Sequence, residues 1–460
     1  MEQIAVKPNG EKLTLKMRFR EWFIENIVMI IFLSICIAGI IIADQPAYFL
    51  ITQLLERISR NTFLVLALII PVVAGMGLNF SIIIGAMAGQ IAVIIAKNFN
   101  IGGLPGITLV MVLCVPLSIL FGIMIGRLLN KTRGQEMIAS MIVGFFANGL
   151  YQFLFLFLVG LVIPIANKDI LLQSGIGLRN SVDMAGVIQA NADGLTTDGL
   201  KYAIDGIWKM RIFNMVFFYG IMMLAFNSIM LLRKQIVSKI AIKSGSVLSL
   251  ILEPAEPKAD RAYRIRLIGY GILTAVAFAI HYLGMGSTEL KMISTIKFPM
   301  VTGLLIALLA LFNVVIQKTK LGQDFRSVGQ DQHVSKVSGI DVDKVRVIAI
   351  TLSTILAAWG QVIMLQNVGV LNTFGSHMQI GMFSVAALLV GGASVTRATN
   401  AQAFIGVILF HTLFIVSPTA GKTLFGDPQI GEFFRAFVAY GVIGLSLGLY
   451  AWKRAMGKAT

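Results

Sequence analysis

The chain contains a series of apolar runs long enough to cross a bilayer, and this feature constrains its fold most strongly. A helix spans the hydrocarbon core with about 20 mostly apolar residues. Because lipid offers no partner to the backbone, such runs fold as α-helices. They occur at about 23–43, 62–76, 81–97, 104–126, 136–164, 212–232, 266–284, 298–316, 347–367, 376–393, 401–417 and 435–452. We predict an all-α, polytopic integral membrane protein with about 10–12 transmembrane helices, forming one transmembrane domain over residues 1–460.

The charge balance fits a membrane protein better than a nucleic-acid-binding one. Of the 460 residues, 57% are hydrophobic and only 13% are charged, against about 25% charged in soluble domains. The net charge of +16 comes from basic residues in short loops between apolar runs, where such residues set membrane orientation. The aromatic residues on which bases would stack do not alternate with them. We expect membrane lipids around the chain and no nucleic acid partner.

The distribution of basic residues predicts the orientation. Residues 1–22 form a basic leader without a cleavage pattern, so the first helix is retained and the N-terminus is cytoplasmic. An even number of spans then places the C-terminus in the cytoplasm, together with an amphipathic segment and Pro-rich linker at 233–265 and a polar segment at 317–346. Arg57 and Arg60 fall outside the membrane, which is the one local disagreement.

The loop at 165–210 is predicted to be external. Its several Asp residues are nearly balanced by Lys and Arg. It could meet a solute-binding protein through these acidic positions, or it could be an insertion that caps the outer mouth. The sequence leaves both alternatives open.

Two apolar runs are preceded by Gly-containing breaks, near 75–81 and 370–376, that carry no charge. Such interrupted helices avoid lipid and often mark a pathway near the bilayer midplane. The alternative is that the glycines allow close helix packing. If the breaks line a pathway, the polar residues on or near it are Asn79, Ser81, Gln90, Gln361, Asn372, Gln379 and Ser384.

The sequence carries few residues that could perform chemistry. Cys36 and Cys114 lie inside apolar runs, and no histidine has a second ligand at metal-binding spacing. The phosphate-binding loop of nucleotide hydrolases and a set of catalytic side chains are both missing. We therefore expect no enzyme activity, metal or cofactor. Apart from residues at their boundaries, the spans also contain almost none of the ionisable groups that ion-coupled carriers use, so the energy source is expected to lie elsewhere.

A polar segment, Lys320–Arg346, stands between two apolar runs. A short helix is expected from about 330 to 338, bracketed by Gly329 and Gly339. Asp331 near its start would complement the helix dipole, and Gly339 fits a C-terminal stop. This helix would project into the cytoplasm as a docking surface, and the alternative is a basic loop held at the lipid headgroups.

This segment resembles the cytoplasmic coupling segment of ABC importer permeases of the branched-chain amino acid, ribose and nucleoside type. The matching positions are Arg326, Gly329, Gly339, Ile340 and Val342. Three positions depart from the family pattern, with Asp331 in place of Asn and with Val334 and Ser335 in place of an Ala pair. The stretches at 134–144, 77–90 and 382–394 are similar to further family segments, so the resemblance covers most of the chain.

The resemblance implies a permease subunit of an ABC importer in the bacterial plasma (inner) membrane. A separate ATPase subunit would dock through Arg326, Gly329, Asp331, Val334, Ser335, Gly339 and Ile340. A second permease subunit and an extracytoplasmic solute-binding protein would complete the assembly. Uncharged amide and hydroxyl groups along the pathway favour a simple sugar or nucleoside, which needs hydrogen bonds when water is removed. The alternatives are a branched-chain amino acid importer permease and a stand-alone secondary carrier.

Overall fold

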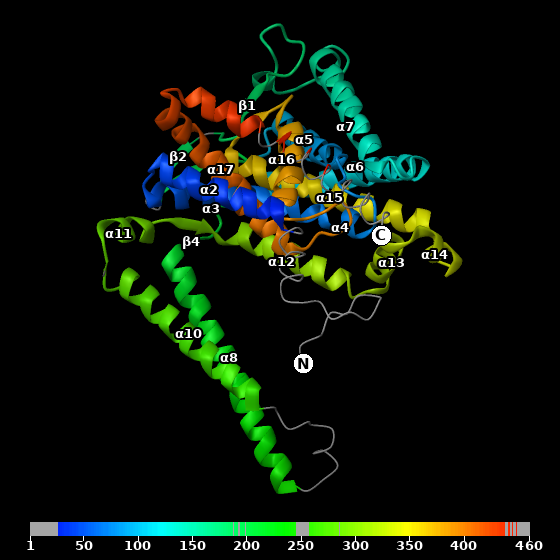
Figure 1. Ribbon diagram of the computed structural model, residues 1–460. Coiled ribbons are helices and arrows are strands. Elements are labelled where there is room, and N and C mark those ends of the chain that lie inside the picture. The colour runs from blue at the N-terminus through cyan, green and yellow to red at the C-terminus, as the bar shows by residue number, and fades with distance from the viewer. Residues whose placement is uncertain are drawn as a thin grey trace. The chain divides into compact units, whose positions relative to one another are not determined.

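A computed structural model describes residues 26–186, 188–191, 194–197, 199–244, 257–284, 286–437, 440, 441, 444 and 448. These residues are mostly helical (Figure 1). The helices are α2 (Ile27–Ala43), α3 (Ala47–Ala67), α4 (Ile69–Val73), α5 (Ile82–Asn98), α6 (Gly103–Lys131), α7 (Glu136–Phe153), the π-helix η1 (Leu154–Leu158), the 3-10 helix η2 (Lys168–Ile170), α8 (Ile212–Ser244), α10 (Pro257–His281), α11 (Thr288–Ser294), α12 (Met300–Ile316), α13 (Lys320–Gln330), α14 (Gln332–Val337), α15 (Val342–Val368), α16 (Ser376–Val390) and α17 (Asn400–Phe425). The strands pair antiparallel as β1 (Ser181–Asp183) with β6 (Val370–Asn372), β2 (Ile188–Asn191) with β3 (Gly194–Thr197), and β4 (Lys209–Arg211) with β5 (Lys297–Pro299).

The prediction of an all-α polytopic membrane protein is confirmed. Among the described residues, six helices are long and apolar enough to span a bilayer: Gly103–Lys131, Glu136–Leu158, Ile212–Met230, Tyr263–His281, Val342–Val368 and Asn400–Phe425. The pair α12 and α13, bent by 74°, gives up to seven. The apolar helices α2, α5 and α16 are shorter. The predicted leader at 1–22 and most of the predicted last span at 435–452 lie outside the described residues.

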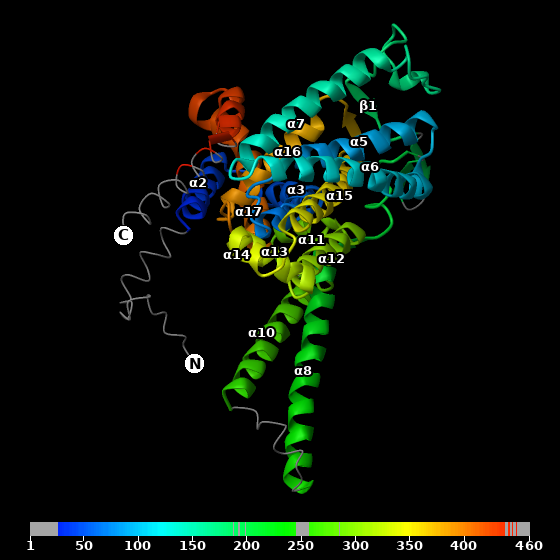
Figure 2. The same cartoon turned by 90° about the vertical axis from the view of Figure 1, so that its right-hand side faces the viewer.

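The chain divides into two compact units, one of which comprises residues 46–52 and 208–300. In it α8 and α10 run side by side in both views (Figure 1, Figure 2). The Phe217 ring lies 5.8 Å from that of Phe278 and 5.7 Å from that of Tyr282, measured between centroids. Helix α8 continues to Ser244, so the segment predicted at 233–265 begins as a helix, and its residues 245–256 lie outside the described part.

The other unit contains the described residues of 1–45, 53–207 and 301–460, and α15 is its central helix. Helix α5 approaches α15 through Gly85 and Gly89, where a Cβ on Gly85 would stand 2.6 Å from the Thr354 carbonyl oxygen. Helix α6 uses the same four-residue spacing, with Gly122 and Gly126 against α15. Small residues at this spacing let helix backbones meet closely in membranes. Close helix packing therefore explains Gly85 and Gly89, which lie in α5 after the break predicted at 75–81.

Both predicted helix breaks are present. Helix α4 ends at Val73 and α5 begins at Ile82, and the turn between them contains two residues with positive φ, Gly75 (73°) and Gly77 (68°). The second break is the strand β6, which is followed by α16 from Ser376. These segments leave helical backbone groups without their usual partners, which must then be found elsewhere in the protein.

The loop at 165–210 supplies partners to the second break. Strand β1 lies antiparallel to β6, with Ser181 opposite Asn372. The Thr373 hydroxyl donates to the Arg179 carbonyl at 2.7 Å, and the Thr373 amide donates to the Asn180 carbonyl at 2.8 Å. The backbone of the break is thus hydrogen-bonded to this loop.

Helix α3 is longer than the sequence predicted. The apolar run was expected to begin at about 62, whereas the helix begins at Ala47. Glu56, Arg57 and Arg60 interrupt the apolar pattern, which hid the first turns of the helix. The two arginines lie on this helix rather than in a loop, and they line a pocket in the unit that contains residues 53–207 and 301–460.

Candidate functional site

The polar segment begins with α13, whose axis is bent by 74° from that of the preceding helix α12. Thr319 caps α13, since its hydroxyl oxygen accepts a hydrogen bond from the Gly322 amide at 3.3 Å. The apolar side chains of Phe325 and Val328 are buried. On the opposite face Arg326 is exposed and donates to Gln317 Oε1 at 2.9 Å. Figure 2 shows α13 and α14 following α12.

Gly329 brings α13 into backbone contact with the first helix break. A Cβ on Gly329 would stand 2.2 Å from the Val73 carbonyl oxygen, and one on Gly75 would stand 2.6 Å from the Gly329 Cα. These distances leave no room for a side chain. Because Val73 is the last residue of α4, α13 touches the chain where the break begins. A displacement of α13 would therefore act directly on that break.

The short helix predicted at about 330–338 is present as α14. Asp331 is its N-cap, with Oδ1 accepting hydrogen bonds from the His333 amide at 2.8 Å and the Val334 amide at 3.0 Å. Gly339 has a φ of 83°, which suits the left-handed conformation that ends a helix. Asp341 then caps α15 through the Lys344 amide at 3.0 Å.

Helix α14 exposes two apolar side chains. Val334 is 60% exposed and Val337 is 78% exposed, and their i, i+3 spacing places them on one face. Ser335 is buried, and its hydroxyl donates to the Asp331 carbonyl at 2.7 Å. The structure therefore separates the predicted coupling residues, with Val334 on the surface and Ser335 inside. The sequence analysis missed Val337, although its spacing from Val334 was the available signal.

Hydrogen bonds from the Val334 and His333 amides lower the pKa of the exposed Asp331 carboxyl below its usual value. A lowered folded-state pKa means that the cap stabilises α14 fully above the ordinary pKa of about 3.9 and is lost as pH falls through the lower folded value. We expect Asp331→Ala to increase amide exchange at His333 and Val334 at pH 6, with a smaller difference from the wild type at pH 3, where the wild-type cap is itself being lost. Asp331→Asn, which keeps an acceptor that does not titrate, should remove the acid loss of protection. Hydrogen exchange at pH 6 and pH 3 measures both, and acid-labile protection in Asp331→Asn would contradict the assignment.

A buried ion pair ties the polar segment to other helices. Arg346 at the start of α15 is fully buried, and its Nη2 lies 2.7 Å from Glu136 Oε1 at the start of α7. The same nitrogen donates to the Leu129 carbonyl of α6 at 3.3 Å. A second ion pair nearby, between Arg133 and Asp343, is largely exposed.

Three polar side chains meet next to the second break. The Nε2 atoms of Gln90 and Gln361 donate to the Ser376 hydroxyl oxygen at 2.6 and 3.1 Å. Gln90 also donates to the Asn372 carbonyl at 3.1 Å. The Oε1 atoms of both glutamines are buried without a hydrogen-bond partner. Ser376 was missed from the sequence, since nothing distinguished it from other hydroxyls near the break.

The other predicted pathway residues are distributed differently. Asn79 and Ser81 bond to each other in the first break, where Asn79 Oδ1 accepts from the Ser81 amide at 3.1 Å and from its hydroxyl. Ser384 is buried and donates to the Ile380 carbonyl within α16 at 2.7 Å. Gln379, one turn after Ser376, is exposed and lines a pocket.

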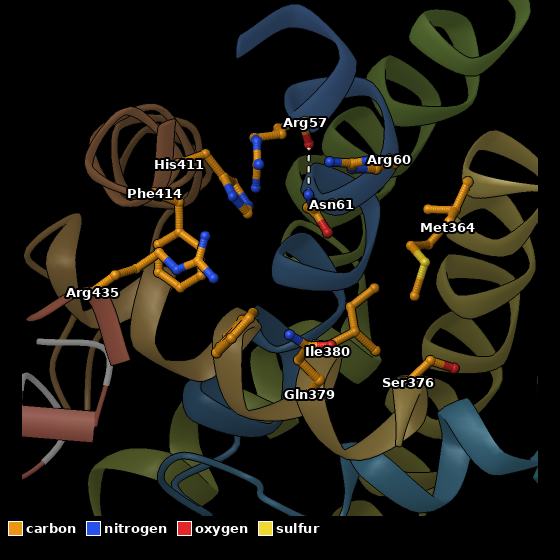
Figure 3. A pocket seen from close by; sticks show the side chains of 12 residues that line it. Arg57, Arg60, Asn61, Met364, Ser376, Gln379, Ile380, His411, Phe414 and Arg435 are labelled. Atoms are coloured by element: carbon orange, nitrogen blue, oxygen red, sulfur yellow. Dashed lines mark hydrogen bonds between the residues drawn. The ribbon is translucent and has the colours of Figure 1, made fainter. Parts of the chain in front are cut away.

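This pocket has a volume of about 300 Å³ and is formed by α3, α15, α16, α17 and Arg435 (Figure 3). Its lining residues are Arg57, Arg60, Asn61, Met364, Val368, Ser376, Gln379, Ile380, Phe383, His411, Phe414 and Arg435. An adjoining pocket of about 560 Å³ shares Gln379, Phe383, Phe414 and Arg435 with it. The sequence analysis predicted Gln379 here but none of the cationic side chains. The unexplained position of Arg57 and Arg60 was the one signal that could have found them.

The chain is similar to known permeases. Residues 203–443, more than half of the chain, match the family model described as branched-chain amino acid transport system / permease component. The chain belongs to this permease family.

Permeases of characterised transport systems are among its curated relatives. An autoinducer 2 import system permease protein of Klebsiella pneumoniae is 32% identical over 106 residues, which cover 22% of this chain and 30% of the relative. A xylose transport system permease protein of Haemophilus influenzae is 26% identical over 138 residues, covering 30% of this chain and 35% of the relative. The chain thus spans well under half the length of these relatives. No solved structure matches it.

Proposed function

We propose that this permease-family chain is the transmembrane subunit of an ABC importer and that a separate ATPase subunit docks on residues 320–346. The observation that carries the proposal is the combination of an exposed apolar surface and a backbone contact in one segment. Helix α14 presents Val334 and Val337 to solvent, and the preceding helix α13 touches the first helix break through Gly329. One end of the segment can bind a partner while the other acts on the membrane part.

The proposed mechanism is transmission of a rigid-body movement. Closure of the ATPase would push α14, and α13 would pass the displacement to the end of α4 because their backbones are in contact. Asp331 and Gly339 fix the two ends of α14, so the helix moves as one body. Arg326 and Ile340 lie beside this surface in the sequence and are assigned to it on the family resemblance.

For the solute we propose a small polar molecule of the simple-sugar or nucleoside class. The two relatives described above are permease proteins of an autoinducer 2 import system and a xylose transport system. The pathway would pass Gln379, Ser376 and the two glutamines beneath it, Gln90 and Gln361. Their partnerless Oε1 atoms could accept hydrogen bonds from solute hydroxyls. A branched-chain amino acid remains the second candidate, because the family description names that class.

The remaining parts of the proposal concern assembly and orientation. We place the chain in the bacterial plasma membrane with both termini and residues 320–346 in the cytoplasm. A second permease subunit, identical or related, and an extracytoplasmic solute-binding protein complete the importer. The loop at 165–210 would then cap the outer mouth, a role supported by its pairing with the second break.

Substituting the exposed valines tests the docking surface. We expect Val334→Asp combined with Val337→Asp to reduce co-purification of the cognate ATPase subunit by at least about tenfold, because each aspartate would place an unpaired charge in an apolar contact, and about 1.4 kcal/mol corresponds to tenfold in affinity. The matched control is Val162→Asp, which introduces the same charge at a valine that is 67% exposed and lies outside residues 320–346.

The outcomes separate the importer from a stand-alone carrier. Retention of the ATPase subunit by the valine variant would refute the docking surface. Solute uptake by the purified wild-type chain in liposomes under an ion gradient, without any bound ATPase, would refute the importer and favour a secondary carrier.

A further inference from the structure

The pocket described above is strongly cationic. Arg57, Arg60 and Arg435 line it together with His411, whereas no Asp or Glu is among its lining residues. Arg435 pairs with Glu432 and lies 4.7 Å from the centroid of the Phe414 ring. Neither of the other two guanidinium groups forms an ion pair within the described part of the chain. The Glu56 carboxylate interacts electrostatically with both, but Glu56 is not among the residues that line the pocket.

The position of Arg57 and Arg60 in the pocket follows from their place on α3 and not from ion pairs with other side chains. They are three residues apart on α3 and therefore lie on one face. Both are partly buried. Arg57 Nε is buried without a hydrogen-bond partner, and the hydrogen bond drawn between Arg57 and Asn61 uses only the Arg57 backbone carbonyl (Figure 3).

A third polar group in the wall also lacks a partner. His411 on α17 is 4% exposed, and its Nδ1 has no hydrogen bond. Figure 3 shows its ring and Arg57 facing the same space. Two like charges and an unpaired imidazole in a partly dehydrated site favour the binding of a negatively charged group there.

The rest of the wall is suited to the body of a small molecule. Phe383, Phe414, Ile380 and Met364 supply apolar surface, and Gln379 supplies an amide. The volume of about 300 Å³ is at the small end of ligand sites. Guanidinium groups bind carboxylate and phosphate oxygens in pairs of hydrogen bonds.

We infer that the solute carried by this protein has an oxyanion group, a carboxylate or a phosphate, which Arg57 and Arg60 bind in this pocket. The inference rests on the proposed function for the solute's route, and it replaces the neutral sugar or nucleoside proposed above with an acidic or phosphorylated one. An anionic lipid headgroup carries the same chemistry and is the source that the experiment must separate from a soluble solute.

Arginine protection tests this with the full chain in nanodiscs of phosphatidylcholine. Phenylglyoxal modifies accessible guanidinium groups, and mass spectrometry reads the modification at each arginine. We expect ribose 5-phosphate and gluconate to slow modification of Arg57 and Arg60 by at least about tenfold. A tenfold change corresponds to about 1.4 kcal/mol of free energy. Ribose at the same concentration should not slow it. The exposed Arg179 should react equally in all samples.

Variants sharpen the test. Arg57→Gln should weaken the protection of Arg60 by about tenfold or more, because it removes one of the two charged donors to the oxyanion. Arg179→Gln should leave that protection unchanged. Equal protection by ribose, or no protection by either anion, would overturn the inference.

Protection that appears only when phosphatidylglycerol is added to the nanodiscs would also overturn it, because a lipid would then occupy the site. The assay requires neither an ATPase subunit nor transport. Its failure is therefore distinguishable from failure of the importer proposal, which is tested by retention of the ATPase.

Discussion

Replacing Arg346 with methionine should lower the free energy of unfolding by about 3–5 kcal/mol, the usual cost of removing one partner from a buried ion pair. The reason is that Glu136 would keep its charge in a site where its carboxylate is only 12% exposed. The Leu129 carbonyl would also lose a donor. Thermal unfolding of the purified chain in detergent measures the loss.

Two control variants make this prediction specific. Arg133→Met removes a partner from the exposed pair with Asp343 and should change stability by at most about 1 kcal/mol. Adding Glu136→Gln to Arg346→Met should recover part of the stability, because the unpaired charge is gone. If Arg133→Met and Arg346→Met were equally destabilising, the buried pair would not hold the ends of α7 and α15 together.

Gly329→Leu should abolish most of the transport while leaving the ATPase subunit bound. The new Cβ would stand 2.2 Å from the Val73 carbonyl oxygen, so α13 must move away from α4. Overpacking of this kind costs roughly 1–3 kcal/mol, and each 1.4 kcal/mol is about tenfold in an equilibrium. We expect solute uptake to fall at least about tenfold, as measured in vesicles, with unchanged co-purification of the ATPase, because Val334 and Val337 are untouched.

The matched control is Gly149→Leu in α7, where a Cβ would meet no atom within 4 Å. It introduces the same side chain into a membrane helix without displacing α13. Normal uptake by Gly329→Leu, or equal losses in the two variants, would show that the contact between α13 and α4 does not transmit movement.

The spanning helices could be predicted because their signal is local. A run of apolar residues is sufficient to specify a membrane helix, and the breaks at 75–81 and 370–376 were visible as Gly-containing interruptions. Helix α3 was underestimated for the same reason, since Arg57 and Arg60 carry charges that a hydropathy pattern assigns to water. Only the packing of distant helices shows that these side chains face a pocket.

The two candidate sites differ in how far the sequence could define them. Helix α14 was predictable with its caps, because Asp331 and Gly339 act on their own neighbours in the chain. The cationic pocket was not, because α3, α16, α17 and Arg435 contribute to it from separate parts of the sequence. Likewise, the meeting of Gln90 and Gln361 at Ser376 depends on how α5, α15 and α16 pack.

The pairing of β1 with β6 has a consequence for the evolution of the chain. The ladder is made by backbone groups, which every residue except proline can provide in full. Mutations can therefore replace most side chains in this part of the loop without releasing the break that it holds. Related proteins could share this bracing while their loops show no recognisable sequence similarity, so the contact would leave little trace in alignments.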